Sequence, residues 1–341
     1  MKEALYYEKL DDKKVKCNLC HRHCIIPEGE FGVCGARRNI DGVLYSLTYG
    51  RPISINLDPI EKKPLYHFYP GETTLSLGTL SCNFKCKHCQ NWEISQARAD
   101  MNPNPYTYKP EDIIELAREN KSWIISYTYN EPTVFYEYAI EIMKLAKETK
   151  TLFKKFRNVW VTNGYIEKEP LKELCKYLDA ANVDIKCFSE KVFRELTSAS
   201  GLRHILGNVK YMFEQGIHIE LTYLIIPGLN DDDLQLTAFC EWVKKELSLD
   251  VPIHFNRFHP DYKMIDVPET PVETLKRAYS IAKSKGLRYV YIGNIYLDRV
   301  CNTYCPNCGA LLIDRFGFVI KNIGIKDGKC TNCGFEIYGR F

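Results

Sequence analysis

The amino-acid sequence predicts an α/β protein whose centre is a partial barrel of parallel strands. From residue 75 onward, short runs of β-branched and aromatic residues alternate with amphipathic segments of helical period. Most of the fifteen cysteines fall into three groups with the spacing of metal ligands: one before this region, one inside it and one after it. We therefore expect an N-terminal four-cysteine module with a connector over residues 1–70, a barrel over 71–300 and a C-terminal module over 301–341.

The alternation of strand and helix implies parallel strands joined by right-handed crossovers. The expected strands are 75–80, 123–128, 159–162, 183–186, 218–226, 253–258 and 289–292. The expected helices include 110–119, 136–149, 169–178, 232–247 and 272–284. In such barrels the chemistry lies at the carboxyl ends of the strands, so the residues that follow each strand are the candidates for function.

Composition limits the classes of partner. The net charge is only +3 in 341 residues, so nucleic acid and anionic membranes are not expected partners. The N-terminal segment has no signal-peptide core, and no run of about 18 apolar residues occurs, so we expect a cytoplasmic protein that does not span a membrane. In a reducing compartment, grouped cysteines are better explained by metals than by disulfides.

The central cysteine group is Cys82, Cys86 and Cys89, in a C-x3-C-x2-C array directly after the first expected strand. A 4Fe-4S cluster normally takes four cysteines, so a compact trio predicts one iron left open for an exchangeable ligand. The alternative is a zinc knuckle, but structural zinc sites are closed and four-coordinate, and no fourth ligand lies nearby in the sequence.

The N-terminal group offers four thiols, which are enough to close a metal site. Its members are Cys17, Cys20, Cys24 and Cys34. Thiolates suit zinc and iron-sulfur clusters alike, and His21 and His23 could compete for a ligand position, so both metals remain alternatives here.

The C-terminal group consists of two C-x2-C knuckles, typical of zinc ribbons and rubredoxin-like folds. Its members are Cys305, Cys308, Cys330 and Cys333. Structural zinc is favoured over iron. Cys301 recreates the C-x3-C-x2-C spacing, but we expect it to lie outside the site because the two knuckles already supply four ligands.

Polar residues follow several of the expected strands. Asn130 and Glu131 could hold a cationic amino group, and Asn163 lies in a Thr-Asn-Gly turn able to approach a ligand. Asp184 and Lys186 should point to the same side by period-two alternation, although they could simply pair with one another.

Two further features have structural and functional interpretations. Residues 58–65, DPIEKKPL, read as an extended connector fixed by its two prolines. The functional alternative is that Lys62, Lys63 or His67 borders the cluster pocket. Cys187 follows Lys186 and is expected to be an inert thiol, with a reactive thiol at the pocket mouth as the alternative.

Residues from about 70 to 295 resemble the activating enzymes of pyruvate formate-lyase and other glycyl radical enzymes, within the radical S-adenosylmethionine (SAM) superfamily. The resemblance implies a partial (β/α)6-type radical SAM barrel in which the Cys82 trio holds a 4Fe-4S cluster and the amino and carboxylate groups of SAM bind the open iron. It places further SAM contacts at His88, Asn130, Glu131, Asp184, Lys186 and His259. Val161 stands where these activases carry an acid that helps to bind a cation.

Over its full length the chain is similar to the radical SAM enzymes of the AmmeMemoRadiSam system. The four-cysteine module, DPIEKKPL, YTYNEPT and NTYCPNCG carry this similarity. It implies Memo-type or AMMECR-type protein partners, an electron donor such as ferredoxin or flavodoxin, and anaerobic or protected conditions.

The expected activity is reductive cleavage of SAM to a 5'-deoxyadenosyl radical that abstracts hydrogen from a substrate, which is a protein in the glycyl radical activating enzymes. Radical-dependent methylation or small-molecule rearrangement is the alternative within enzymes. A metal-binding adaptor with an inert barrel is the alternative from another class.

Overall fold

The computed structural model describes residues 1–149, 154–297 and 299–341. Its centre is an eight-stranded sheet in the order β14-β13-β12-β11-β10-β9-β8-β7. The strands are β7 Ser54–Pro59, β8 Thr73–Gly78, β9 Ile124–Tyr127, β10 Arg157–Thr162, β11 Ala180–Asp184, β12 His218–Ile225, β13 Ile253–Arg257 and β14 Val290–Gly293. Strands β8 to β14 are parallel and follow chain order, whereas β7 pairs antiparallel with β8. Because β7 and β14 end the pairing order, the barrel is open, which confirms the expected fold class.

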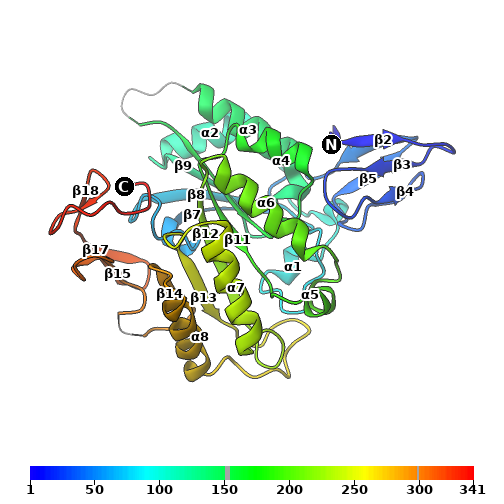
Figure 1. The fold of residues 1–341 in the computed structure, drawn as a ribbon. Coiled ribbons are helices and arrows are strands. Elements are labelled where there is room, and N and C mark those ends of the chain that lie inside the picture. The colour runs from blue at the N-terminus through cyan, green and yellow to red at the C-terminus, as the bar shows by residue number, and fades with distance from the viewer. Residues whose placement is uncertain (150–153, 298) are drawn as a thin grey trace.

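Helices cover the outer face of this sheet (Figure 1). The α-helices are α1 Trp92–Ser95, α2 Pro110–Glu119, α3 Tyr136–Glu148, α4 Lys168–Cys175, α5 Glu190–Thr197, α6 Leu202–Glu214, α7 Asp233–Glu246 and α8 Val272–Ser284. Short 3-10 turns occupy η1 Ile60–Lys62, η2 Ala99–Met101 and η3 Pro132–Phe135. No described helix combines the length and the apolar character that a membrane span requires.

Helix α2 shows why the strongly periodic segments were predictable. Pro110 stands at its first position, where a missing N–H costs nothing. The Asp112 carboxylate accepts a hydrogen bond of 2.7 Å from the backbone N–H of Lys109, which caps the helix. Ile113 and Ala117 are buried one turn apart, so a single apolar stripe faces the core.

Two small modules flank the barrel on opposite sides (Figure 1). The N-terminal module contains the sheets β1-β6-β5 and β2-β3-β4, and the C-terminal module contains β15-β16-β17 and β18-β19. Their bounds are β1 Lys2–Glu3, β2 Tyr7–Lys9, β3 Val15–Cys17, β4 Ile25–Ile26, β5 Arg37–Ile40, β6 Val43–Ser46, β15 Thr303–Tyr304, β16 Leu311–Phe316, β17 Val319–Ile323, β18 Ile325–Lys326 and β19 Lys329–Cys330.

The structure corrects the expected elements in three places. The start of the segment read as a connector, 58–65, is the end of β7, and η1 follows it directly. Strand β11 spans Ala180–Asp184, whereas 183–186 was expected. Its alanines have a low strand propensity, and pairing with the strands on both sides holds them in the sheet. Helices α5 and α6 fill the link between β11 and β12, where no helix was named.

Candidate functional site

The loop that carries the central cysteines leaves β8 at Gly78. A Cβ at this position would lie 2.6 Å from the backbone oxygen of Thr128, so only glycine permits the two strand ends to approach this closely. Asn130 then holds the next residues: its Oδ1 accepts from the N–H of Thr79 at 3.2 Å, and its Nδ2 donates to the oxygen of Ser81 at 2.7 Å. Asn130 therefore positions the backbone that leads into Cys82.

The middle of the loop is fixed by the end of α5. The backbone N–H groups of Lys85 and Lys87 donate to the oxygens of Thr197 and Leu196 at 2.9 and 3.0 Å. Phe84, which precedes Lys85, is fully buried and anchors the loop in the core. A loop held at several points can present its thiols in a fixed geometry before any metal binds.

Cys82, Cys86 and Cys89 line one wall of a cavity of about 860 Å³ that runs along the carboxyl ends of the strands. Among the described residues, the three Sγ atoms do not all lie within 4.8 Å of one another. Tetrahedral zinc would place thiolates only about 3.8 Å apart, given a Zn–S bond of about 2.3 Å. The trio is therefore spaced for something larger than one ion.

Burial shapes the acidity of Cys82. Desolvation first, and then the nearby Cys86 sulfur and the Glu131 carboxylate, raise the pKa of Cys82 well above its ordinary value. Three thiolates crowded beside a carboxylate are stable only when a cation compensates them. The donor set therefore fits a positively charged iron-sulfur core.

Glu131 is buried at the end of β9 and accepts a dense set of hydrogen bonds. Thr162 donates from its hydroxyl at 2.8 Å, Asn163 from its backbone at 2.8 Å, and Thr133 from its backbone at 3.0 Å. Desolvation raises the pKa of Glu131 and these donors oppose that rise. The hydrogen-bond donors to its carboxylate among the described residues are all neutral, and Glu131 also lines the cavity. A cationic ligand would supply the missing charge.

Asp184 and Lys186 lie at the end of β11 and both line the cavity. Lys186 Nζ donates to Asp184 Oδ2 at 2.9 Å, so the two side chains point to the same side, as alternation predicted. Burial lowers the pKa of Lys186, but Asp184 and Cys86 outweigh it and raise the pKa overall. Lys186 is thus a cation beside the cysteine loop.

His88 is buried within the cysteine loop and lines the same cavity. Burial, followed by the charge of Lys186, lowers the pKa of His88 to about 3, so the imidazole is neutral. Its Nδ1 has no hydrogen-bond partner in the part of the chain that is described. Such an orphaned polar atom marks a place where a ligand can donate or accept a hydrogen bond.

Asn163 and His259, the remaining predicted contacts of the barrel, are placed differently. Asn163 lines the cavity, but its Nδ2 donates to Asn83 Oδ1 at 2.8 Å and its Oδ1 accepts from Tyr165 at 2.9 Å, so its side chain supports the wall. His259 is exposed and is not among the lining residues; its Nε2 meets Gln90, which does line the cavity, at 2.8 Å.

The lining of the cavity also includes part of DPIEKKPL. Lys62 and Lys63 line the cavity, and both donate to Asp58, at 2.9 and 2.7 Å. Tyr129 donates to the same carboxylate at 2.5 Å while its ring lies 4.5 Å from Lys63 Nζ. The functional alternative for this segment is therefore supported for the two lysines, which border the pocket.

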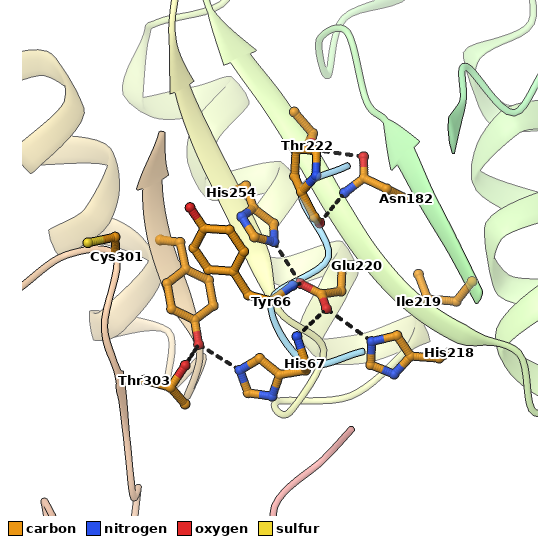
Figure 2. Close-up of polar contacts among 12 residues, drawn as sticks. Tyr66, His67, Asn182, His218, Ile219, Glu220, Thr222, His254, Cys301 and Thr303 are labelled. Atoms are coloured by element: carbon orange, nitrogen blue, oxygen red, sulfur yellow. Dashed lines mark hydrogen bonds and ion pairs between the residues drawn. The ribbon is translucent and has the colours of Figure 1, made fainter. Parts of the chain in front are cut away.

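His67 instead belongs to a buried network beneath the cavity, which no sequence motif indicated. Glu220, fully buried on β12, accepts hydrogen bonds from His218 at 3.0 Å and His254 at 2.7 Å (Figure 2). The backbone N–H of His67 donates to the same carboxylate at 2.7 Å. Burial opposes ionisation, but the two histidine bonds lower the pKa of Glu220. The network ties residue 67 to β12 and β13, and His254 also lines the cavity floor.

The C-terminal cysteines form a compact group, as expected. The Sγ atoms of the four members, Cys305, Cys308, Cys330 and Cys333, all lie within 4.8 Å of one another. The pair Cys305 and Cys333 is separated by 3.6 Å, and the pair Cys308 and Cys330 by 3.8 Å. This spacing fits one tetrahedral ion held by thiolates. Cys301 lies outside the group and lines the large cavity instead.

The remaining thiols fall into two kinds. Cys17, Cys20, Cys24 and Cys34 surround a second, smaller cavity in the N-terminal module. Cys187 is buried, does not line the large cavity, and contacts the oxygen of Ser189 at 3.3 Å. Burial raises the pKa of Cys187 to about 11, which suits the inert thiol that the sequence favoured.

Known proteins share parts of this sequence and this fold. A family model described as the Radical SAM superfamily matches residues 77–240. An uncharacterized protein of Methanocaldococcus jannaschii is 48% identical over 339 residues, 99% of each chain. The pyruvate formate-lyase-activating enzyme of Streptococcus mutans is 27% identical over 176 residues, 48% of this chain and 63% of that one. Streptococcus suis SuiB bound to SAM has the same fold, with a TM-score of 0.51 and 14% identity over 70% of this chain and 53% of that chain.

The family match begins inside β8, includes the whole cysteine loop and ends within α7. It therefore covers the strands whose carboxyl ends carry Glu131, Asp184 and Lys186. The Methanocaldococcus jannaschii relative aligns over 99% of this chain, so its similarity includes the N-terminal and C-terminal modules. On these grounds the chain belongs to the radical SAM superfamily.

Proposed function

We propose that Cys82, Cys86 and Cys89 hold a 4Fe-4S cluster with one open iron, and that SAM binds this iron from the adjoining cavity. The observation that carries the proposal is the geometry of the trio: one buried and two half-buried thiols, spaced more widely than a single ion requires, face a cavity of about 860 Å³. Cavities of about 300–1,000 Å³ hold ligands of this size. When bound, the reduced cluster and SAM supply a 5'-deoxyadenosyl radical that removes a hydrogen atom from the substrate.

The chain's own residues would orient SAM. Glu131 would hold the methionine ammonium group, because its carboxylate is buried, lines the cavity and accepts hydrogen bonds only from neutral donors among the described residues. Lys186, kept charged by Asp184, would face an anionic or hydroxyl-bearing part of the ligand. His88 would meet the adenine through the unpartnered Nδ1. Asn130 and Asn163 would act by holding the loop and the wall in place.

His259 would approach the nucleoside only from the rim, through Gln90. Because it is exposed, its contribution to SAM affinity should be smaller than that of Glu131. The glycyl radical activating enzymes carry an acid directly before the Thr-Asn-Gly turn. Val161 takes that position in this chain and lines the cavity, and its side chain offers no ligand atom to a cation.

The substrate would enter past Tyr296 and Phe318. Both residues line the cavity, and both side chains are about half exposed or more. Exposed aromatic side chains at a cavity mouth favour a substrate that extends beyond the cavity, such as a protein segment. One relative is named for activating pyruvate formate-lyase, which agrees with a protein substrate.

Two further components complete the proposal. The C-terminal four-cysteine group would hold structural zinc, because its sulfur separations match a mononuclear tetrahedral site. Reduction of the cluster requires a one-electron donor, for which ferredoxin or flavodoxin are candidates. Memo-type or AMMECR-type proteins stay candidate partners on sequence similarity alone.

The test is anaerobic reconstitution with iron and sulfide, followed by dithionite and SAM. Wild-type protein should release 5'-deoxyadenosine, and the combined Cys82→Ala, Cys86→Ala, Cys89→Ala variant should release none. A wild-type preparation with a spectroscopically intact cluster that yields no 5'-deoxyadenosine would count against the proposal. Net S-adenosylhomocysteine would indicate methylation instead, and a glycyl radical signal in a candidate protein would indicate activation.

A further inference from the structure

The N-terminal module contains four thiols whose separation differs from that of the C-terminal group. No three of the sulfurs of Cys17, Cys20, Cys24 and Cys34, all of them described, lie within 4.8 Å of one another. A zinc ion with Zn–S bonds of about 2.3 Å requires tetrahedral thiolates about 3.8 Å apart. The C-terminal group of the same chain meets that requirement, with separations of 3.6 and 3.8 Å, whereas the N-terminal group does not.

The space between these four thiols is a cavity rather than packed protein. All four cysteines line it, and its other walls include the apolar side chains of Leu19, Ile26 and Val134 together with Arg22 and Arg37. Leu19, Ile26 and Val134 are all buried. A void bounded by four sulfurs and apolar side chains suits a compact inorganic core that takes its ligands from the sulfurs and excludes water.

The two histidines interleaved with these cysteines point elsewhere. His21 Nδ1 lies 2.9 Å from Glu167 Oε1, and His23 Nε2 lies 3.2 Å from the same oxygen. Neither histidine is among the residues that line the cavity. The competition for a ligand position that the sequence allowed is therefore resolved in favour of four cysteines.

The sulfurs also receive N–H donors. The backbone N–H of Ala36 donates to Cys34 Sγ at 3.4 Å, and Arg37 Nη1 lies 3.6 Å from Cys17 Sγ. Arg37 is buried and paired with Glu137 of α3, so its guanidinium is held in place beside the thiols. N–H groups directed at sulfur stabilise the thiolate form and raise the reduction potential of an iron-sulfur cluster.

We propose that Cys17, Cys20, Cys24 and Cys34 hold a second iron-sulfur cluster, fully ligated by protein, at the boundary between the N-terminal module and the barrel. This inference goes beyond the SAM chemistry. Its four ligands are separate from the Cys82 trio, and only the electron-transfer role argued below rests on the proposed function.

The position of this second site gives it a role. Asn83 lines the N-terminal cavity and directly follows Cys82 in the chain. Arg22 of the N-terminal module donates to the backbone oxygen of Asn83 at 2.7 Å. Thr133 lines the N-terminal cavity as well, and donates to Glu131 in the wall of the large cavity. Asn83 and Thr133 thus form a wall between the N-terminal cavity and residues that line the large cavity.

A centre in this position can pass electrons. A one-electron donor protein would reduce the N-terminal cluster, which would then be oxidised by one electron as the cluster on the Cys82 trio is reduced by one. No atoms move between the centres in this step. The full protein ligation of the N-terminal cluster suits electron transfer, because no iron is left open for a substrate.

Metal analysis of the full-length protein tests the ligands. After anaerobic reconstitution we expect about eight iron and eight sulfide per chain in wild type, and about four of each in the combined Cys82→Ala, Cys86→Ala, Cys89→Ala variant. The paired Cys24→Ser, Cys34→Ser variant should also fall to about four, and Cys175→Ser on α4, outside every group, should keep about eight.

Mössbauer spectra and zinc counts decide among the other outcomes. If the trio variant binds no iron and wild type carries about two zinc ions, the N-terminal site holds zinc and the proposal is wrong. It is equally wrong if these thiols carry no metal and react with a thiol reagent in the folded protein. The trio variant keeps the N-terminal site intact, so the result stands even if the Cys24, Cys34 variant does not fold.

Electron paramagnetic resonance tests the proximity. In fully reduced wild type we expect a broadened or split signal from two magnetically coupled clusters, which is not the sum of the spectra of the two single-cluster variants. A spectrum that equals the sum would overturn the shared wall as a route for electrons. Neither measurement requires SAM turnover, so failure of this inference and failure of the proposed function are distinguishable.

Discussion

The backbone N–H of Asn163 donates a hydrogen bond of 2.8 Å to the carboxylate of Glu131. These residues follow neighbouring parallel strands, β9 and β10, which lie side by side in the sheet. The bond therefore joins two strand ends through one buried anion that faces the cavity. A charge held in this way is positioned before any ligand arrives, which lowers the cost of binding a cationic group.

Replacing Glu131 with glutamine removes that charge while keeping the shape of the side chain. We expect the dissociation constant for SAM to rise about 10- to 100-fold, equivalent to about 1.5–3 kcal/mol for a lost charged hydrogen bond. The measurement is equilibrium SAM binding to the reconstituted protein, with iron content checked in parallel. Glu169→Gln on the surface of α4 is the matched control. Unchanged SAM affinity in E131Q would remove Glu131 from the binding site.

Gly78 should tolerate no side chain. In Gly78→Ala the new methyl group meets the Thr128 oxygen at 2.6 Å, so the strand ends must separate. We expect a loss of about 1–3 kcal/mol in the free energy of unfolding, and lower iron retention because the cysteine loop starts here. In Gly207→Ala, by contrast, nothing lies within 4 Å of the added Cβ in α6, so the change should be neutral or stabilising by up to about 1 kcal/mol. Equal denaturation midpoints for the two variants would contradict this.

The C-terminal group should release its metal when one ligand is lost. Cys308→Ser removes a thiolate 3.8 Å from Cys330, and three remaining ligands bind zinc less tightly than four. Zinc per chain should fall from about one towards zero after dialysis against a chelator, and residues 301–341 should become sensitive to limited proteolysis. Cys301→Ser should keep its zinc. Retention of zinc by Cys308→Ser would show that the ion is held elsewhere.

Acid should destabilise the protein partly through His67. Burial lowers the pKa of His67 from 6.5 to about 3, with Glu220, Arg315 and His218 as the charged neighbours. Between these values the unfolded chain binds a proton that the folded chain does not, so stability falls as pH falls from 6.5 towards 3. We expect His67→Gln to reduce the slope of unfolding free energy against pH by about 1.4 kcal/mol per pH unit in this window. Parallel slopes for the two proteins would show that His67 is protonated in the folded state.

The barrel could be predicted from the sequence because its helices and strands have local physical causes. Helix α2 and the parallel strands carry their periodicity in the residues themselves, and the polar residues after each strand had to meet at one edge once the strands were parallel. Asp184 and Lys186 did meet, at 2.9 Å. The C-terminal group was also predictable, because two C-x2-C knuckles define one site by spacing alone.

Other features depend on distant parts of the chain. Glu220 is held by residues at positions 66, 67, 218 and 254, and no local pattern connects them. The N-terminal metal could not be assigned from spacing, since zinc and iron-sulfur sites use the same residues in the same order. Only the distance between the folded sulfurs separates the two. Likewise, no sequence signal distinguishes Asn83 beyond its place after Cys82. Its position in the wall of the N-terminal cavity is visible only in the folded structure.

The most direct test of the open iron is the effect of SAM on the spectrum of the reduced cluster. In the Cys24→Ser, Cys34→Ser variant, or in wild type with its second signal subtracted, adding SAM should change the electron paramagnetic resonance spectrum. Electron nuclear double resonance with nitrogen-15 in the SAM amino group should then show coupling to iron. A fully assembled cluster on Cys82, Cys86 and Cys89 whose spectrum is unaltered by saturating SAM would contradict the account.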